Sequence, residues 1–214
     1  MKIYMDVCCL CRPFDDQMIG RIRLEATAVQ EIIRHCAAQK FSLVSSEVIA
    51  EELSKIPDIR KRLRVGKIIS VAKESILIDA GIISRMHELI LLGGDAMDSL
   101  HIACAERAGA VLLTTDDGLI TFFKSHRDIQ VQTRKPGYLV KGGNTMSAKT
   151  LHQVQQEGLD VLVEKLGPDD AIRFLQIYET GSGDWTKDRK KILEKDPDKI
   201  IKSIMEKRKK VPAP

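Results

Sequence analysis

Short apolar runs alternate with longer segments of helical periodicity along the first 133 residues. The apolar runs lie at 2–9, 41–44, 76–78, 111–114 and 129–132. Between them, apolar side chains recur at the spacing of an amphipathic helix, as in 15–40 and 82–92. Strands that alternate with helices form a parallel sheet covered by helices on both faces. The sequence therefore predicts an α/β domain over residues 1–133, built as a three-layer parallel sheet of four to five strands.

Beyond residue 133 the pattern changes. Residues 134–149 contain Lys135-Pro136-Gly137 and Gly142-Gly143-Asn144, a composition typical of a linker. Residues 150–178 return to helical periodicity, which is interrupted once at Gly167-Pro168. We therefore expect residues 150–214 to form a short α-helical appendage that ends in a basic tail.

The basic residues are concentrated near the C-terminus. The 214-residue chain has a formal charge of +4, but between Lys187 and Lys210 eleven basic residues face only five acidic ones. The rest of the chain is thus slightly acidic. Such a tail could bind a phosphate backbone, an acidic partner surface or only water. A hydrophobic fraction of 43% excludes a disordered chain.

The N-terminal sequence and the cysteines bear on location. Asp6 stands where a signal peptide would have its apolar core, and no apolar stretch approaches the roughly 20 residues of a membrane span. Three of the five cysteines crowd into Cys8, Cys9 and Cys11, a spacing that suits neither a disulfide framework nor a paired zinc site. We expect a cytoplasmic protein with reduced thiols and no contact with membranes.

Acidic residues fall where the predicted strands end. They are Asp6 in or after the first strand, Glu51 and Glu52 in the helix after the second, Asp98 in the first turn of its helix, and Asp116 and Asp117 after the strand at 111–114. Ligands of open parallel sheets gather at this edge. Clustered carboxylates repel one another unless a cation lies between them, and hard oxygen ligands favour Mg²⁺ or Mn²⁺. The pattern indicates phosphodiester hydrolysis by metal-activated water.

Each acid also has a structural interpretation. Asp98 could be favoured by the helix dipole, Asp116 could be a turn residue before Gly118, and Glu52 could lie on an exposed helix face. Asp6 is the hardest to explain in this way, because among apolar neighbours it would be buried without a partner.

Three motifs carry a likeness to a known family. They are Met5-Asp6-Val7-Cys8-Cys9-Leu10, Asp98-Ser99-Leu100-His101-Ile102-Ala103 and Leu112-Leu113-Thr114-Thr115-Asp116-Asp117. Together, over residues 1–133, they resemble the PIN-domain family, particularly the VapC-type toxins of bacterial type II toxin-antitoxin systems. The resemblance implies a homodimeric, Mg²⁺- or Mn²⁺-dependent endoribonuclease that acts on RNA.

The resemblance also implies the site residues. Asp6, Glu52, Asp98 and Asp116 match the family's four acids, and Asp6, Asp98 and Asp116 are the expected metal ligands. Thr114 matches the hydroxyl residue that helps to hold the site. Three of these positions have a neighbour of the same type that could take the role instead: Glu51 beside Glu52, Thr115 beside Thr114, and Asp117 beside Asp116.

Three further residues have open roles. Asp95, one helical turn before Asp98, could join the acids or be a solvent-exposed cap. For His101 we expect packing rather than general-base chemistry. Arg12 could contact a substrate phosphate or pair with Asp15 or Asp16.

The C-terminal part carries a second, shorter likeness. The segments 156–159, 166–168, 171–175 and Gly181-Ser182-Gly183-Asp184-Trp185-Thr186 resemble the small antitoxins that accompany PIN toxins. This implies that the partner is an antitoxin-like segment in the same chain or a separate antitoxin. Such a segment could cover the acidic cleft of its own or a neighbouring subunit, and its basic residues Lys187, Arg189, Lys190 and Lys191 could lie opposite the acids. Alternatively, the basic tail could bind DNA.

Two functions from different classes follow. The first is a metal-dependent ribonuclease restrained by its own C-terminal segment. The alternative is a non-catalytic PIN scaffold that serves as a regulatory or nucleic-acid-binding module. The presence of all four acids favours the enzyme.

Overall fold

The computed structural model describes residues 1–126, 129, 131–137, 161, 164–165, 167 and 181–210. Most of the predicted linker at 134–149 and nearly all of the predicted helical segment at 150–178 lie outside the described residues. The described helices at 181–210 belong to the predicted appendage.

Five parallel strands form a single sheet. They are β1 (Lys2–Met5), β2 (Ser42–Ser46), β3 (Glu74–Ile76), β4 (Val111–Leu113) and β5 (Thr133–Arg134), in the order β3-β2-β1-β4-β5. Ile3 of the central strand lies opposite Leu43 on one side and Val111 on the other. Because every pairing is parallel, all the strands end at the same edge of the sheet, which we call the carboxyl edge. The predicted α/β fold is confirmed.

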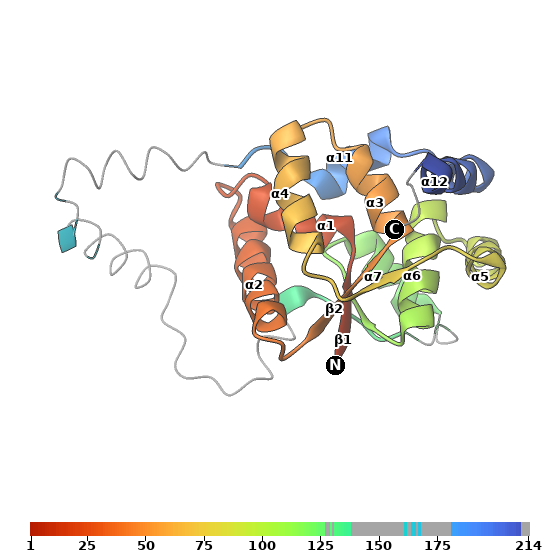
Figure 1. Ribbon diagram of the computed structural model, residues 1–214, viewed down its shortest axis with the longest axis horizontal. Coiled ribbons are helices and arrows are strands. Elements are labelled where there is room, and N and C mark those ends of the chain that lie inside the picture. The colour runs from red at the N-terminus through yellow and green to blue at the C-terminus, as the bar shows by residue number, and fades with distance from the viewer. Residues whose placement is uncertain are drawn as a thin grey trace.

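Helices cover both faces of the sheet. They are α1 (Val7–Cys11), the 3₁₀ turn η1 (Arg12–Phe14), α2 (Gly20–Ala37), α3 (Glu47–Ser54), α4 (Ile59–Ile69), α5 (Ala80–Leu91), α6 (Ala96–Ala108), α7 (Asp117–Ser125), α11 (Trp185–Ile192) and α12 (Pro197–Lys210). Helices α2 and α4 lie on one side and α5 and α6 on the other, while α11 and α12 lie across the top of Figure 1, at the end opposite the N-terminus. The C-terminal helices are therefore near the carboxyl edge.

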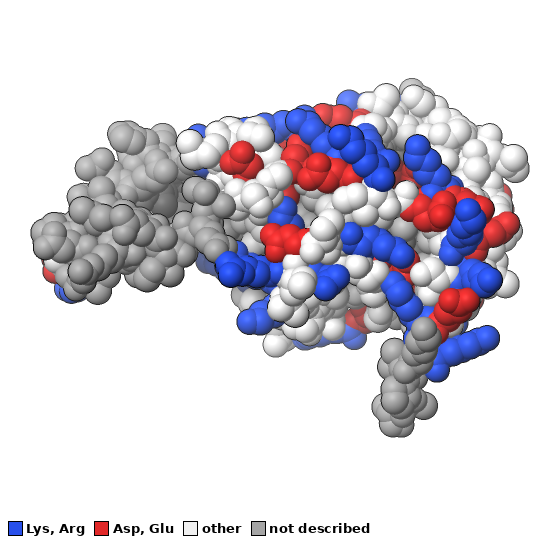
Figure 2. All heavy atoms as spheres, turned by 90° about the horizontal axis from the view of Figure 1, so that it is seen from above, with Lys and Arg blue, Asp and Glu red and all other residues white. Residues whose placement is uncertain are grey.

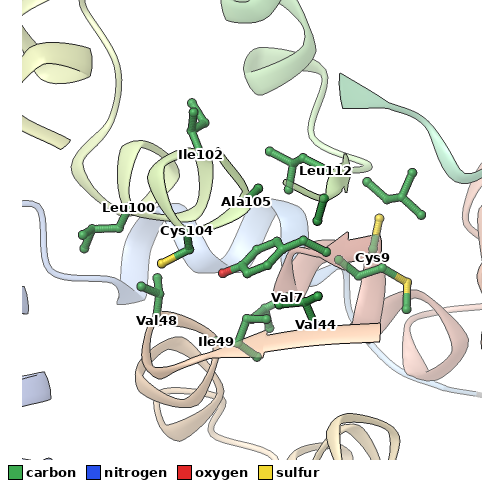
Figure 3. Packing of buried hydrophobic residues seen from close by; sticks show 14 of the residues in the cluster. Val7, Cys9, Val44, Val48, Ile49, Leu100, Ile102, Cys104, Ala105 and Leu112 are labelled. Atoms are coloured by element: carbon green, nitrogen blue, oxygen red, sulfur yellow. The ribbon is translucent and has the colours of Figure 1, made fainter. Parts of the chain in front are cut away.

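The core explains why β1 carries no alternation of apolar and polar residues. Residues 3–5 are fully buried because helices cover both faces of the central strand. Leu100 and Cys104 of α6 pack close to Val48 and Ile49 of α3 (Figure 3). This packing fixes α3 and α6, the two helices that carry Glu52 and Asp98.

Three predicted strands differ clearly from the observed ones. The strand expected at 76–78 is found at Glu74–Ile76. The strand expected at 2–9 ends at Met5, since Asp6 caps α1 by accepting a hydrogen bond from the Cys9 backbone N–H at 2.8 Å. The strand expected at 129–132 is found at Thr133–Arg134, although Ile129 and Val131 are buried. A short apolar run shows that residues are buried, but it does not separate a strand from a buried helix or loop.

No helix among the described residues has both the length and the apolar character that crossing a bilayer requires.

Candidate acidic site

The structure brings the four predicted acids together around one arginine. Asp6 follows β1, Glu52 lies in α3, Asp98 lies in the first turn of α6, and Asp116 caps α7 just after β4. The Arg189 guanidinium from α11 donates to both Glu52 oxygens, at 2.9 and 3.2 Å, and to Asp98 Oδ1 at 2.7 Å. Its Nη1 is also 4.0 Å from Asp116 Oδ2. Four segments thus bring carboxylates together at the carboxyl edge, and three of these carboxylates lie within 4.0 Å of Arg189.

Asp6 is buried, but it has partners. Its Oδ1 accepts from the Cys9 backbone N–H, and its Oδ2 accepts from the Thr114 hydroxyl at 2.6 Å. The Thr114 oxygen in turn accepts from the backbone N–H of Asp116 at 3.0 Å. Burial raises the pKa of Asp6 to about 6, although Thr114 and Arg189 act in the opposite direction. Thr114 therefore ties two of the acids together, which is the position the resemblance implied for it.

Glu52 is fully buried and strongly paired. Besides Arg189, its Oε1 accepts from the Trp185 indole N–H at 2.9 Å, and its Oε2 lies 2.9 Å from His101 Nε2. Burial acts to raise the pKa of Glu52, but the Arg189 charge and the His101 hydrogen bond outweigh it and hold the pKa at about 2. Burial raises the pKa of Asp98, with Arg189 opposing it. Among Asp6, Glu52 and Asp98, Glu52 is therefore the most firmly ionised.

A buried chain of hydrogen bonds stands behind Glu52. His101 Nδ1 lies 2.8 Å from the Tyr4 hydroxyl, which lies 2.7 Å from the Ser46 hydroxyl. With its proton on Nε2, the imidazole donates to Glu52 and accepts from Tyr4, so that both ring nitrogens are satisfied. His101 is packed in the core as expected, but it also orients Glu52, which the sequence did not indicate.

The structure separates the neighbouring acids that the sequence left open. Glu51 points away from the site, accepting from Ser203 at 2.9 Å and from Lys207 at 2.6 Å. Asp117 is exposed, and hydrogen bonds from Lys135 and Arg21 lower its pKa to about 2. The structure thus places Glu52 and Asp116, rather than their neighbours, beside Arg189.

The remaining candidates take structural positions. Asp95 is the exposed N-cap of α6, accepting from the Met97 backbone N–H at 3.0 Å. Thr115 is buried, and within the described part of the chain its hydroxyl has no hydrogen-bond partner. Arg12 pairs with Asp15 at 3.0 Å.

Residues 181–210, which we call the strap, close the site. Trp185 and Arg189 are one helical turn apart on α11, are 2% and 3% exposed, and both contact Glu52. Of the four basic residues proposed to face the acids, only Arg189 is buried among them, while Lys190 reaches Asp116 from the surface. Lys190 lies 3.5 Å from Asp116 Oδ2 with its side chain 63% exposed, and Lys187 is exposed and lies near Asp184. The sequence missed Trp185, although its spacing from Arg189 places the two on one helix face.

The second half of the strap packs on α3. Ile200 and Ile204 of α12 are buried, while Lys207 and Arg208 pair with Glu51 and Glu47. Seen from above, this face shows basic and acidic side chains lying next to one another (Figure 2). The acids of the site are therefore covered rather than displayed in an open acidic cleft.

A cleft remains beside the covered acids. It has a volume of about 370 Å³ and is lined by Asp98 and Asp116, by Phe122 of α7, by Arg189 of α11, and by Leu193, which directly follows α11. The acids thus border a space next to the strap, and removing α11 would widen it.

The charge balance of the site favours a further cation. The site holds four carboxylates and one buried guanidinium, and Asp116 Oδ2 is buried without a hydrogen-bond partner among the described residues. Oxygen donors of this kind suit Mg²⁺ or Mn²⁺. Among the described residues, no three His, Cys, Asp or Glu side chains are arranged as a group that could hold a metal ion.

Comparison with protein-family models gives no match, and comparison with curated proteins gives none either.

Proposed function

We propose that this chain is a metal-dependent endoribonuclease of the PIN type whose site is closed by its own strap. The observation that carries the proposal is the cluster of Asp6, Glu52, Asp98 and Asp116, in which Arg189 pairs with Glu52 and Asp98 and lies near Asp116, while Thr114 links Asp6 to Asp116. Acids gathered in this way need a cation, and a guanidinium from a separate segment is a cation that can leave. The strap then occupies the place that a divalent ion would take.

The residues of the site have different roles in the proposed reaction. Asp6, Asp98 and Asp116 would hold Mg²⁺ or Mn²⁺, which when bound activates water and stabilises charge on the phosphoryl oxygens. Thr114 fixes the Asp6 carboxylate through its 2.6 Å hydrogen bond. Glu52, ionised and held by His101, orients the attacking water. Tyr4 keeps the imidazole in position.

RNA cleavage by the full chain and by Arg189→Gln tests the proposal. A mixed RNA pool is incubated with each protein in Mg²⁺, in Mn²⁺ or in chelator. We expect the variant to cut faster, by about tenfold or more, because each 1.4 kcal/mol of lost docking raises the open population tenfold. Cutting should stop in chelator.

Acid variants in the Arg189→Gln background identify the site. Asp6→Asn and Asp98→Asn should abolish cleavage, while Asp117→Asn, an exposed acid beside Asp116, should leave it unchanged. If Arg189→Gln neither cuts RNA nor binds either metal, the enzyme proposal fails. The acids then serve only to hold the strap, as in a non-catalytic PIN module.

We place this activity in the cytoplasm. All five cysteines are free and buried, which suits a reducing compartment. As in the resemblance, we propose a homodimer acting on RNA. Lys207 and Arg208 of the tail already pair with acids of α3, which leaves fewer basic side chains for DNA.

A further inference from the structure

A second buried cluster of charges lies beside the acidic site. The side chains of Arg12 and Lys61 are only 3% and 8% exposed, and both contact Asp15, which is fully buried, at 3.0 and 2.9 Å. Arg12 also pairs with Glu25 at 2.7 Å. Two basic side chains from different elements, η1 and α4, are thus fixed in place by acids of the folded domain.

The strap supplies the remaining oxygens to these two side chains. Asp184 Oδ1 accepts from Arg12 Nη1 at 2.7 Å, and the Ser182 carbonyl accepts from Lys61 Nζ at 2.7 Å. The loop approaches so closely that a Cβ at Gly181 would lie 2.3 Å from the Asp15 carbonyl oxygen. The strap therefore presents a carboxylate oxygen and a carbonyl oxygen side by side to a buried basic pair.

These oxygens leave when the strap leaves. Buried cations that lose an acceptor are costly, so Arg12 and Lys61 would need new oxygen partners. The two non-bridging oxygens of a phosphodiester supply negative charge and acceptors of the same kind, and arginine binds phosphate particularly well.

The position of Arg12 and Lys61 suits a backbone phosphate next to the acidic site. Arg12 follows Asp6 by six residues along α1 and η1, a rise of about 9 Å at helical spacing. Trp185 spans the two sites, with its backbone N–H on Asp15 and its indole on Glu52. Helix α4, which carries Lys61, has five basic residues and no acid. An RNA strand leaving the acidic site in this direction would meet positive charge.

We propose that Arg12 and Lys61 form a subsite for an RNA backbone phosphate next to the acidic site, and that Asp184 of the strap occupies it. The inference rests on the proposed ribonuclease function, whose substrate it positions. The strap thereby closes two subsites at once: Arg189 lies among the acids where a cation would bind, and Asp184 lies where a phosphate would bind.

RNA binding without cleavage tests this subsite. The full chain carrying Arg189→Gln binds a fluorescently labelled single-stranded RNA in chelator, followed by anisotropy. Adding Lys61→Met should weaken binding by about tenfold and reduce the slope of log K against log salt by about 0.7, the value for one phosphate contact on a single strand. Lys61→Arg should restore both, and Lys40→Gln, beyond the C-terminal end of α2, is the matched control.

A second variant leaves the subsite itself intact. In the otherwise unchanged chain, Asp184→Asn should tighten RNA binding, while Asp188→Asn, an exposed acid on α11, should not. The subsite is overturned if the Arg189→Gln protein does not bind RNA, or if Lys61→Met changes binding no more than Lys40→Gln does. Because these binding measurements contain no metal, they do not depend on cleavage. Weaker RNA binding in Lys61→Met would therefore support the subsite even if the chain cut no RNA.

Discussion

The two helices of the strap dock in different ways. Helix α11 inserts Trp185 and Arg189, both nearly fully buried, among carboxylates. Helix α12 buries Ile200 and Ile204, and its charged contacts stay near the surface, with the Lys207 and Arg208 side chains 48% and 37% exposed. One helix is held mainly by buried charge and the other mainly by apolar contact.

This difference separates two roles. The buried charge of Arg189 is stable only while the carboxylates remain its partners. Another cation bound to these acids would therefore weaken the docking of α11 directly. The apolar contact of α12 does not depend on those acids. Helix α12 can therefore keep α11 near the site at a high effective concentration after α11 has left.

The largest effect should come from Arg189. Replacing Arg189 with Gln leaves Glu52 and Asp98 without their cation, and breaking a buried pair costs about 3 to 5 kcal/mol. The chain has one tryptophan, Trp185, so its fluorescence reports α11 alone. We expect its emission to move to longer wavelength as the indole meets water. Lys187→Gln, an exposed position on the same helix, is the control, and unchanged emission in Arg189→Gln would contradict the prediction.

The charge pattern of the sequence does not distinguish α11 from α12. The eleven basic residues between Lys187 and Lys210 look alike in sequence, yet among those whose burial the structure describes only Arg189 is buried. What distinguishes it is a set of carboxylates that come from four distant elements. Sequence placed those acids at strand ends, because a parallel sheet has one carboxyl edge. It did not provide the helical phase that turns Glu52 toward the site and Glu51 toward α12.

Buried hydrogen bonds were still less accessible from the sequence. Alternation of apolar runs and helices predicted the sheet, and the motifs around Asp6, Asp98 and Asp116 predicted where acids would lie. The contact of His101 with Glu52 depends on how α3 packs against α6, which no local pattern records. The strand predicted over 2–9 extends into helix α1 for a related reason, since burial alone does not reveal backbone conformation.

The next largest effect should come from the apolar contact of α12. Ile204→Ala removes a side chain that is 2% exposed, at a cost of about 2 kcal/mol, the low end for a buried isoleucine because a surface helix can relax. Amide hydrogen exchange of residues 197–210 should accelerate. Ile201, which is only partly buried, is the matched position. If Ile204→Ala exchanges no faster than Ile201→Ala, apolar burial does not hold α12.

Adding a divalent ion should affect the two helices unequally. If Mg²⁺ competes with Arg189 for the acids, titration should shift Trp185 emission in the same direction as Arg189→Gln, but by less, because the guanidinium competes for rebinding. Exchange in α12 should stay the same. In Asp98→Asn the Mg²⁺ response should disappear. Equal loosening of both helices would show instead that the strap leaves as one unit.

The smallest effect should come from the exposed ion pair between Arg208 and Glu47. Burial acts to raise the pKa of Glu47, but hydrogen bonds from Arg208 outweigh it and lower the pKa overall. A lowered carboxyl pKa adds docking stability above the usual glutamate value of about 4.3, and this is lost as the pH falls through the lowered pKa. Since the Arg208 side chain is 37% exposed, Arg208→Gln should cost at most about 1 kcal/mol. The NMR chemical shifts of the α12 amides report how much of this helix is docked. Arg208→Gln should lower the docked fraction at neutral pH but not below about pH 4. An equal cost at both pH values would mean that Arg208 stabilises α12 by packing, and α12 would then be held by apolar contact alone.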